Sequence, residues 1–151
     1  MGAELFVPLK VMHIVSVIVA VGANVTYQAW LAFAGRDSTR LVFAIEGIRR
    51  IDRRLASPAY ALVLITGILM VLTGQYPFDA GWIRAALLLY ILVALVGIAV
   101  FAPAIRRQLA LAKTAPTSDE YEALARRTSL LGWFTTFVVF VIVWLMVVKP
   151  F

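Results

Sequence analysis

Four long apolar segments constrain the fold of this chain more than any other feature of its sequence. They cover about residues 11–33, 55–72, 82–101 and 130–148. A helix needs about 20 mainly apolar residues to cross the hydrocarbon core of a bilayer. The chain is 63% hydrophobic over 151 residues, and a soluble domain of this length could not bury so much apolar surface. The sequence therefore predicts an all-α integral membrane protein with a single transmembrane domain over residues 1–151.

The basic residues predict the orientation of these four segments. Six arginines lie in residues 34–54, and four arginines and Lys113 lie in residues 102–129, whereas the link from Gly74 to Gly81 has no basic residue. Loops rich in arginine and lysine stay on the cytoplasmic side. We therefore expect cytoplasmic loops at 34–54 and 102–129, and a four-helix up-down bundle whose N and C termini lie outside. The formal net charge of +6 then reflects topology, so the expected partner is the lipid of a bacterial inner (plasma) membrane, crossed in multiple passes, and not nucleic acid.

Both expected cytoplasmic loops carry patterns typical of helices. In the first loop, apolar residues recur at helical spacing: Leu41, Ile45, Ile48, Ile51 and Leu55. In the second loop, Thr117 or Ser118 precedes an acidic stretch, as at the start of a helix. Polar residues near the inner ends of the first and second spans are expected to form structural ion pairs and caps: Tyr27, Gln28, Asp52, Arg53 and Arg54.

The single histidine, His13, lies in the first apolar segment, where a polar side chain needs a specific reason. One interpretation is a buried imidazole that forms a hydrogen bond across helices. The other is a metal ligand or an axial ligand of a haem iron, because a neutral imidazole nitrogen binds iron and copper. The chain has no cysteine, so iron–sulfur clusters and thiolate metal sites are excluded.

Further residues that could bind a cofactor are predicted at the depth of His13, near the outer surface. They are Lys10, Met12, Met70, Arg84 and Met146. A thioether together with an imidazole can ligate haem iron or hold Cu(I), and Lys10 or Arg84 could pair with haem propionates. The alternative interpretation is structural, because methionine is an ordinary core residue and an arginine at this depth can extend to the head groups.

The stretch LKVMHIVSVIVAVGANVTY resembles the first helix of the four-helix membrane proteins that include the haem-binding protoporphyrinogen oxidase HemJ and the CopD-like copper-resistance domains. Lys10 and His13 match the Lys-x-x-His pattern of that family, and Gly22 or Ala23 matches its small-residue site. The run IDRRLASPAYALVLITGILM matches the arginine-rich entry to the second helix, and Gly81-Trp82 matches the start of the third. The fourth helix matches only in kind.

This resemblance implies haem b bound by His13. The oxidase pattern also has a lysine about one turn after the Gly-Trp pair, where this chain has Ala86, with Arg84 two residues earlier. The chain is therefore more similar to the uncharacterised integral membrane branch of the superfamily, and an oxidoreductase activity of the oxidase type stays an open question.

Three functions remain open from the sequence. The first is a haem-b-binding membrane protein with a redox or porphyrin-related role, in which His13 is the axial ligand. The second is a non-catalytic subunit or scaffold of a membrane complex, with a membrane protein partner or a second copy of the chain. The third is a copper-handling, permease-like protein that uses His13 together with methionines.

Overall fold

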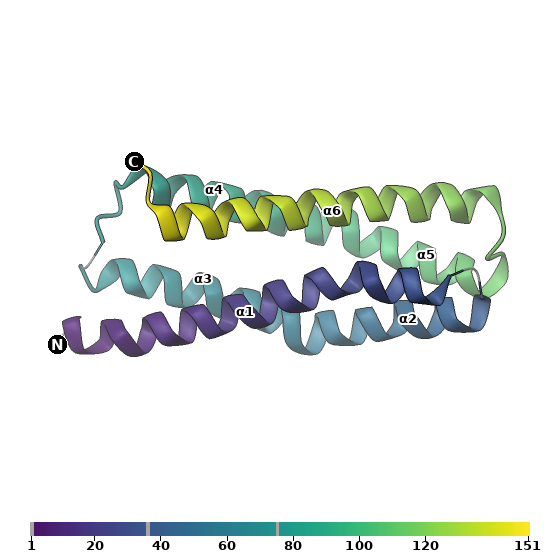
Figure 1. Cartoon of the computed structure of the whole chain (residues 1–151), viewed down its shortest axis with the longest axis horizontal. Coiled ribbons are helices and arrows are strands. Elements are labelled where there is room, and N and C mark those ends of the chain that lie inside the picture. The colour runs from purple at the N-terminus through teal and green to yellow at the C-terminus, as the bar shows by residue number, and fades with distance from the viewer. Residues whose placement is uncertain (1, 36, 75) are drawn as a thin grey trace.

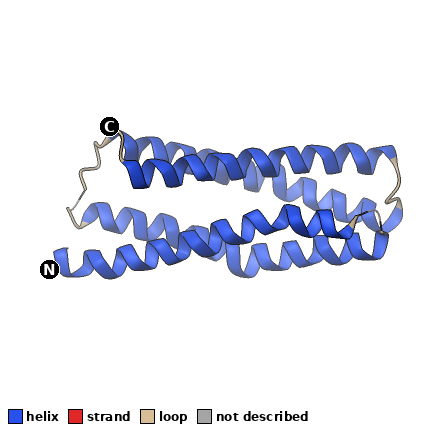
Figure 2. Cartoon of the chain, in the orientation of Figure 1, coloured by secondary structure: helices blue, strands red, loops and turns tan. Residues whose placement is uncertain are grey.

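The computed structural model describes residues 2–35, 37–74 and 76–151. Within these ranges every regular element is a helix (Figure 2): α1 (Gly2–Ala34), α2 (Ser38–Ile51), η1 (Asp52–Ala56), α3 (Ser57–Leu72), α4 (Gly81–Val96), η2 (Gly97–Phe101), α5 (Ala102–Thr114) and α6 (Asp119–Val148). No loop separates the π-helical turns η1 and η2 from their neighbours, so α2–η1–α3 and α4–η2–α5 are each one continuous rod. Together with α1 and α6, these rods are the four helices long and apolar enough to span a membrane. The predicted fold class is confirmed.

The four rods run up and down (Figure 1). Both termini lie at one end of the molecule, next to the link between α3 and α4. The connections α1–α2 and α5–α6 lie at the opposite end. We call this the basic end, because the arginine-rich segments are there, and we call the end with the N and C termini the termini end. Which end faces the cytoplasm stays a prediction from the positive-inside rule.

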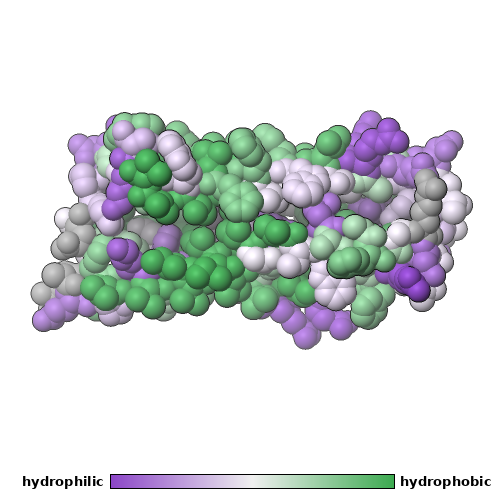
Figure 3. Space-filling model, viewed as in Figure 1, coloured by the Kyte–Doolittle hydropathy of each residue, from purple (hydrophilic) through white to green (hydrophobic). Residues whose placement is uncertain are grey.

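The helices are longer than the apolar segments. Only residues near 35–37 and 115–118 separate the helices at the basic end, so most of the expected loops 34–54 and 102–129 is helical. α6 has 30 residues, which corresponds to about 45 Å, whereas the hydrocarbon core is about 30 Å thick. The rods therefore project beyond the hydrocarbon. Figure 3 shows apolar residues over much of the length and hydrophilic residues toward both ends.

Both composite rods contain a π-helical turn directly before a proline. Pro58 and Pro103 each occupy the second position of the α-helix that follows the turn. A proline ring collides with the carbonyl oxygen four residues earlier and offers it no N–H. The preceding residues instead donate their N–H groups five residues back, Ser57 to Asp52 and Ala102 to Gly97. The wider turn accommodates the proline without ending the helix.

The two halves of the bundle pack differently. At the basic end, residues from α1, α2, α5 and α6 form one buried apolar cluster: Ala34, Leu41, Ala44, Ile45, Ile105, Leu109, Ala112 and Tyr121. Toward the termini end, α1 packs on α3 and α4 packs on α6. Among the described residues, no Cα atom of α3 lies within 8 Å of one in α4 or α6. The bundle is therefore closed at the basic end and divided into two helix pairs in the half that carries His13.

Candidate functional site

His13 lies on the face of α1 that packs against α3. Its Nδ1 atom is 3.0 Å from the Oγ1 atom of Thr66, a completely buried side chain of α3. Thr66 Oγ1 also lies 2.5 Å from the carbonyl oxygen of Leu62, one turn earlier in α3. The hydrogen bond across helices expected for His13 is therefore present, and Thr66 is its partner.

The hydrogen bonds of Thr66 determine which nitrogen of His13 carries the proton. A carbonyl oxygen only accepts, so the single hydroxyl hydrogen of Thr66 goes to Leu62. The lone pairs of Thr66 Oγ1 then accept a hydrogen bond from His13 Nδ1–H. A neutral imidazole has one N–H, so Nε2 carries a lone pair. This is the arrangement of a metal-ligating histidine, whose second nitrogen donates to a neighbouring acceptor.

Small residues allow α1 and α3 to approach each other around the imidazole. An added Cβ atom at Gly67 would lie 3.3 Å from His13 Cε1 and 3.6 Å from Nδ1. The buried stripe of α1 beside His13 continues with Ser16, Ala20 and Ala23. These four positions let the imidazole sit against the backbone of α3 and not between two bulky side chains.

The other predicted cofactor residues are divided between the two helix pairs. Met70 is buried and follows Thr66 by one turn in α3, so it lies on the same interface as His13. Lys10 is exposed, and Met12 is 47% exposed, both in α1. Arg84 and Met146 belong to the α4–α6 pair, where Arg84 is exposed and Met146 is partly buried. Among the described residues, no three His, Cys, Asp or Glu side chains come together in a way that could hold a metal ion.

A family described as a predicted integral membrane protein, DUF2269, matches residues 7–150. The chain belongs to the DUF2269 family. No curated protein and no solved structure matches it. Membership confirms that the chain is an integral membrane protein, whereas the resemblance to HemJ and CopD-like proteins stays a prediction, because the description of DUF2269 mentions neither haem nor copper.

In this DUF2269 protein a layer of polar side chains crosses the middle of the bundle. Asn24 of α1 donates to the hydroxyl of Tyr60 at 3.1 Å, and the hydroxyl of Tyr90 in α4 donates to the backbone carbonyl of Tyr60 at 2.8 Å. Ser129 of α6 donates to Gln28 of α1 at 3.2 Å. These bonds connect the two helix pairs at the level where they begin to separate.

The ion pairs expected at the inner end of the second span are not formed. Asp52 accepts a hydrogen bond from Ser57 at 3.4 Å, and within the described part of the chain Arg53 and Arg54 have no hydrogen bond or salt bridge. Tyr27 is only 3% exposed, and its hydroxyl has no hydrogen-bond partner among these residues. Asp52 is close enough to interact with it electrostatically. Asp52 is therefore the group that could accept the hydrogen of the Tyr27 hydroxyl.

An aromatic cluster at the termini end was not predicted from the sequence. The ring of Tyr76 forms edge contacts with Phe6 and Trp82 at centroid distances of 5.5 and 5.4 Å. The Lys149 ammonium donates to the Tyr76 hydroxyl at 3.0 Å and lies 4.4 Å from the centre of that ring. Phe151 packs on Gly81, where a side chain would collide with it. We call Phe6, Tyr76, Trp82, Lys149 and Phe151 the aromatic cap, and it joins α1, α4 and α6.

Proposed function

We propose that this DUF2269 protein binds haem b in the divided half of its bundle, with His13 Nε2 as the axial ligand, and takes part in one-electron transfer in a bacterial inner membrane. The observation that carries the proposal is the hydrogen bond from His13 Nδ1 to Thr66, because it leaves Nε2 with a lone pair. A haem iron needs a single protein nitrogen on one side, and this chain supplies one histidine in all.

The donor set of this chain fits a haem better than a bare metal ion. Zinc and copper sites are built from three or four protein ligands, whereas the α3 groups around His13 are a hydroxyl, a backbone carbonyl and a glycine. The wide spacing of α3 from α4 and α6 supports the same choice, because cofactors in helical bundles are held between facing helices.

Several residues would have distinct roles in holding the haem. Thr66 orients the imidazole and makes Nε2 a better donor to iron. The proposed second ligand is a methionine, Met146 of the opposite helix pair or Met70 of α3. Lys10 and Arg84 are the proposed partners of the propionates. When bound, the haem supplies a reversible ferric–ferrous couple. Oxidoreductase chemistry on a porphyrin is a further proposal that depends on this binding.

The test is a visible absorption spectrum of the full chain, purified in detergent after expression with haem precursor supplied. We expect a Soret band that shifts on reduction with dithionite, and we expect it to be lost in His13→Ala. Thr66→Val keeps the ligand but removes the acceptor for Nδ1–H, so haem affinity should fall by about 10-fold to 100-fold. Gly22→Ala is the matched control, because an added methyl group there has no atom within 4 Å.

Two other outcomes would favour one of the other two functions over haem binding. A colourless protein that binds Cu(I), with binding lost in Met70→Leu, would indicate the copper-handling function. A colourless protein that binds no metal, and that co-purifies with another membrane protein in both wild type and His13→Ala, would indicate a structural subunit. A colourless wild-type protein after expression with haem would overturn the haem proposal in either case.

A further inference from the structure

We propose that the exposed face of α6 binds an anionic phospholipid, whose phosphate group is held by Arg126 and Arg127 and whose acyl chain lies along Leu130, Trp133 and Phe137. The five residues form a surface that we call the α6 lipid face. It lies away from His13, so the proposal is independent of haem binding.

The two arginines are available to a ligand. Both are exposed, and neither has a hydrogen bond or salt bridge to another residue that the structure describes. By contrast, Arg107 is paired with Glu120 and Lys113 with Glu46. An unpaired guanidinium group offers five N–H donors in a planar arrangement that matches the oxygen atoms of a phosphate.

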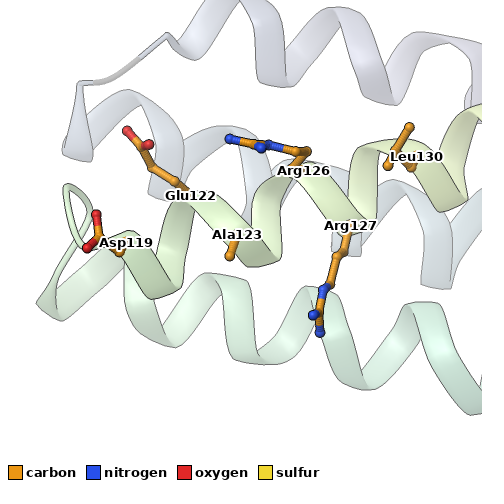
Figure 4. A pocket seen from close by; sticks show the side chains of 6 residues that line it. All are labelled: Asp119, Glu122, Ala123, Arg126, Arg127 and Leu130. Carbon is orange, nitrogen blue, oxygen red and sulfur yellow. The ribbon is translucent and has the colours of Figure 1, made fainter.

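A groove on α6 joins these arginines to the apolar surface. It has a volume of about 350 Å³ and is lined by Asp119, Glu122, Ala123, Arg126, Arg127 and Leu130. Figure 4 shows that the two arginines leave α6 on different sides of the groove, with Leu130 on the same side as Arg126. A head group between the two guanidinium groups would therefore have an apolar residue directly below it.

The apolar part of the face continues at helical spacing. Leu130, Trp133 and Phe137 follow Arg126 at intervals of four, seven and eleven residues, which places them in one stripe. They are 65%, 61% and 67% exposed, respectively. Such side chains are covered by lipid in a membrane, and a tryptophan one turn inside the head groups is typical of the interface.

The groove has acidic as well as basic residues, and their depth in the membrane decides which of them a lipid head group meets. Leu130 begins the fourth apolar segment, and Arg126 lies four residues before it, or about 6 Å along the axis, where lipid phosphates lie. Asp119 is eleven residues before Leu130, or about 16 Å, and is beyond the phosphate layer. Glu122 has a partner of its own. The charge that a phospholipid meets at its own depth is therefore positive.

The experiment measures quenching of Trp133 by brominated phospholipids. A protein with Trp30→Phe, Trp82→Phe and Trp144→Phe retains Trp133 as its single tryptophan and is reconstituted in phosphatidylcholine vesicles. Brominated phosphatidylglycerol should bind next to Trp133 several-fold more strongly than brominated phosphatidylcholine or phosphatidylethanolamine. A protein that retains only Trp144, near the other end of α6, should show no such preference.

Two matched variants decide between a site and diffuse surface charge. Arg126→Gln with Arg127→Gln should reduce the preference for the anionic lipid toward one. Arg53→Gln with Arg54→Gln removes the same charge from another unpaired pair and should leave the preference at Trp133 unchanged. Equal loss in both variants, or no preference in the parent protein, would overturn the proposal. Circular dichroism and size-exclusion profiles establish that each variant is folded before it is compared.

Discussion

The imidazole of His13 is held between a hydroxyl and a glycine of α3. Thr66 accepts its Nδ1–H, and Gly67 leaves room for Cε1. The sequence predicted His13 as the residue of interest, but it did not pair this histidine with Thr66 or Gly67. The pairing depends on which face of α1 packs against α3. Neither the mean hydropathy nor the periodicity of the sequence indicates that face.

A methyl group at Gly67 tests this close approach. Alanine in place of glycine normally stabilises a helix by up to about 1 kcal/mol. At Gly67 the new Cβ would lie 3.3 Å from His13 Cε1, so the gain should be offset and the imidazole displaced. We expect Gly67→Ala to unfold at a lower temperature than Gly22→Ala, measured in the same detergent. Equal melting temperatures for the two variants would show that the imidazole is not confined by α3.

At the scale of elements, the π-helical turn η1 explains where the helical pattern of the sequence fails. Leu41, Ile45 and Ile48 are buried as their spacing predicts, but Leu55 is 50% exposed and Ala56 is buried in its place. An α-helical period carried through residues 52–56 puts Leu55 on the buried face. The wider turn before Pro58 shifts the face by one residue, and periodicity alone gives no warning of it.

Either Thr117 or Ser118 fits the sequence pattern of a cap for α6, and the structure identifies Ser118 as the cap. Its hydroxyl accepts a hydrogen bond from the backbone N–H of Tyr121 at 3.1 Å. We expect Ser118→Ala to destabilise the protein by about 1 kcal/mol, measured by thermal or denaturant unfolding. Thr117→Ala, next to it and exposed, is the control and should be neutral; the reverse order of effects would move the cap to Thr117.

The ion pair between α2 and α5 gives the basic end a dependence on pH. Lys113 donates to Glu46 at 2.6 Å and holds the pKa of that carboxyl below its ordinary value. The pair therefore stabilises the fold above the ordinary glutamate pKa of about 4.3, and this contribution is lost as the pH falls through the lowered value. Because both side chains are exposed, the contribution is small.

Melting temperatures measured from about pH 6 to about pH 3 should reveal this contribution. Wild type should lose more stability on acidification than Glu46→Gln, which has no carboxyl to protonate at this position. Glu4→Gln, at the opposite end of the molecule, should behave like wild type. A parallel decline in wild type and Glu46→Gln would show that the pair does not hold α2 against α5.

At the scale of the whole molecule, the sequence predicted the number of membrane helices and their alternation, because both follow from apolar segments and short connections. The aromatic cap could not be predicted in this way. Its members come from α1, the α3–α4 link, the start of α4 and the chain after α6. In the sequence alone, each is an ordinary interfacial aromatic residue or a residue near the end of the chain. Only the packing of the whole bundle places Phe6 and Lys149 against the same ring, that of Tyr76.

The orientation predicted from the arginines is open to a direct test, because the chain has no cysteine. Asp79→Cys lies in the exposed link at the termini end, and Thr117→Cys lies in the exposed connection at the basic end. A maleimide that cannot cross membranes should label Asp79→Cys in intact bacterial cells. It should label Thr117→Cys only after the cells are permeabilised. The opposite pattern would show that the termini face the cytoplasm.

The divided half of the bundle also has a mechanical consequence. Where helices interdigitate along their length, changing their separation costs packing energy over many turns, and the structure is stiff. Among the described residues, no Cα atom of α3 comes within 8 Å of one in α4 or α6. The hydrogen bond from Tyr90 to Tyr60 joins the pairs in the middle of the bundle, and a few rings and one ammonium group hold them at the termini end. The distance between the two helix pairs should therefore change more easily than any other dimension of the molecule. The lateral pressure and the thickness of the surrounding lipid should change this distance directly.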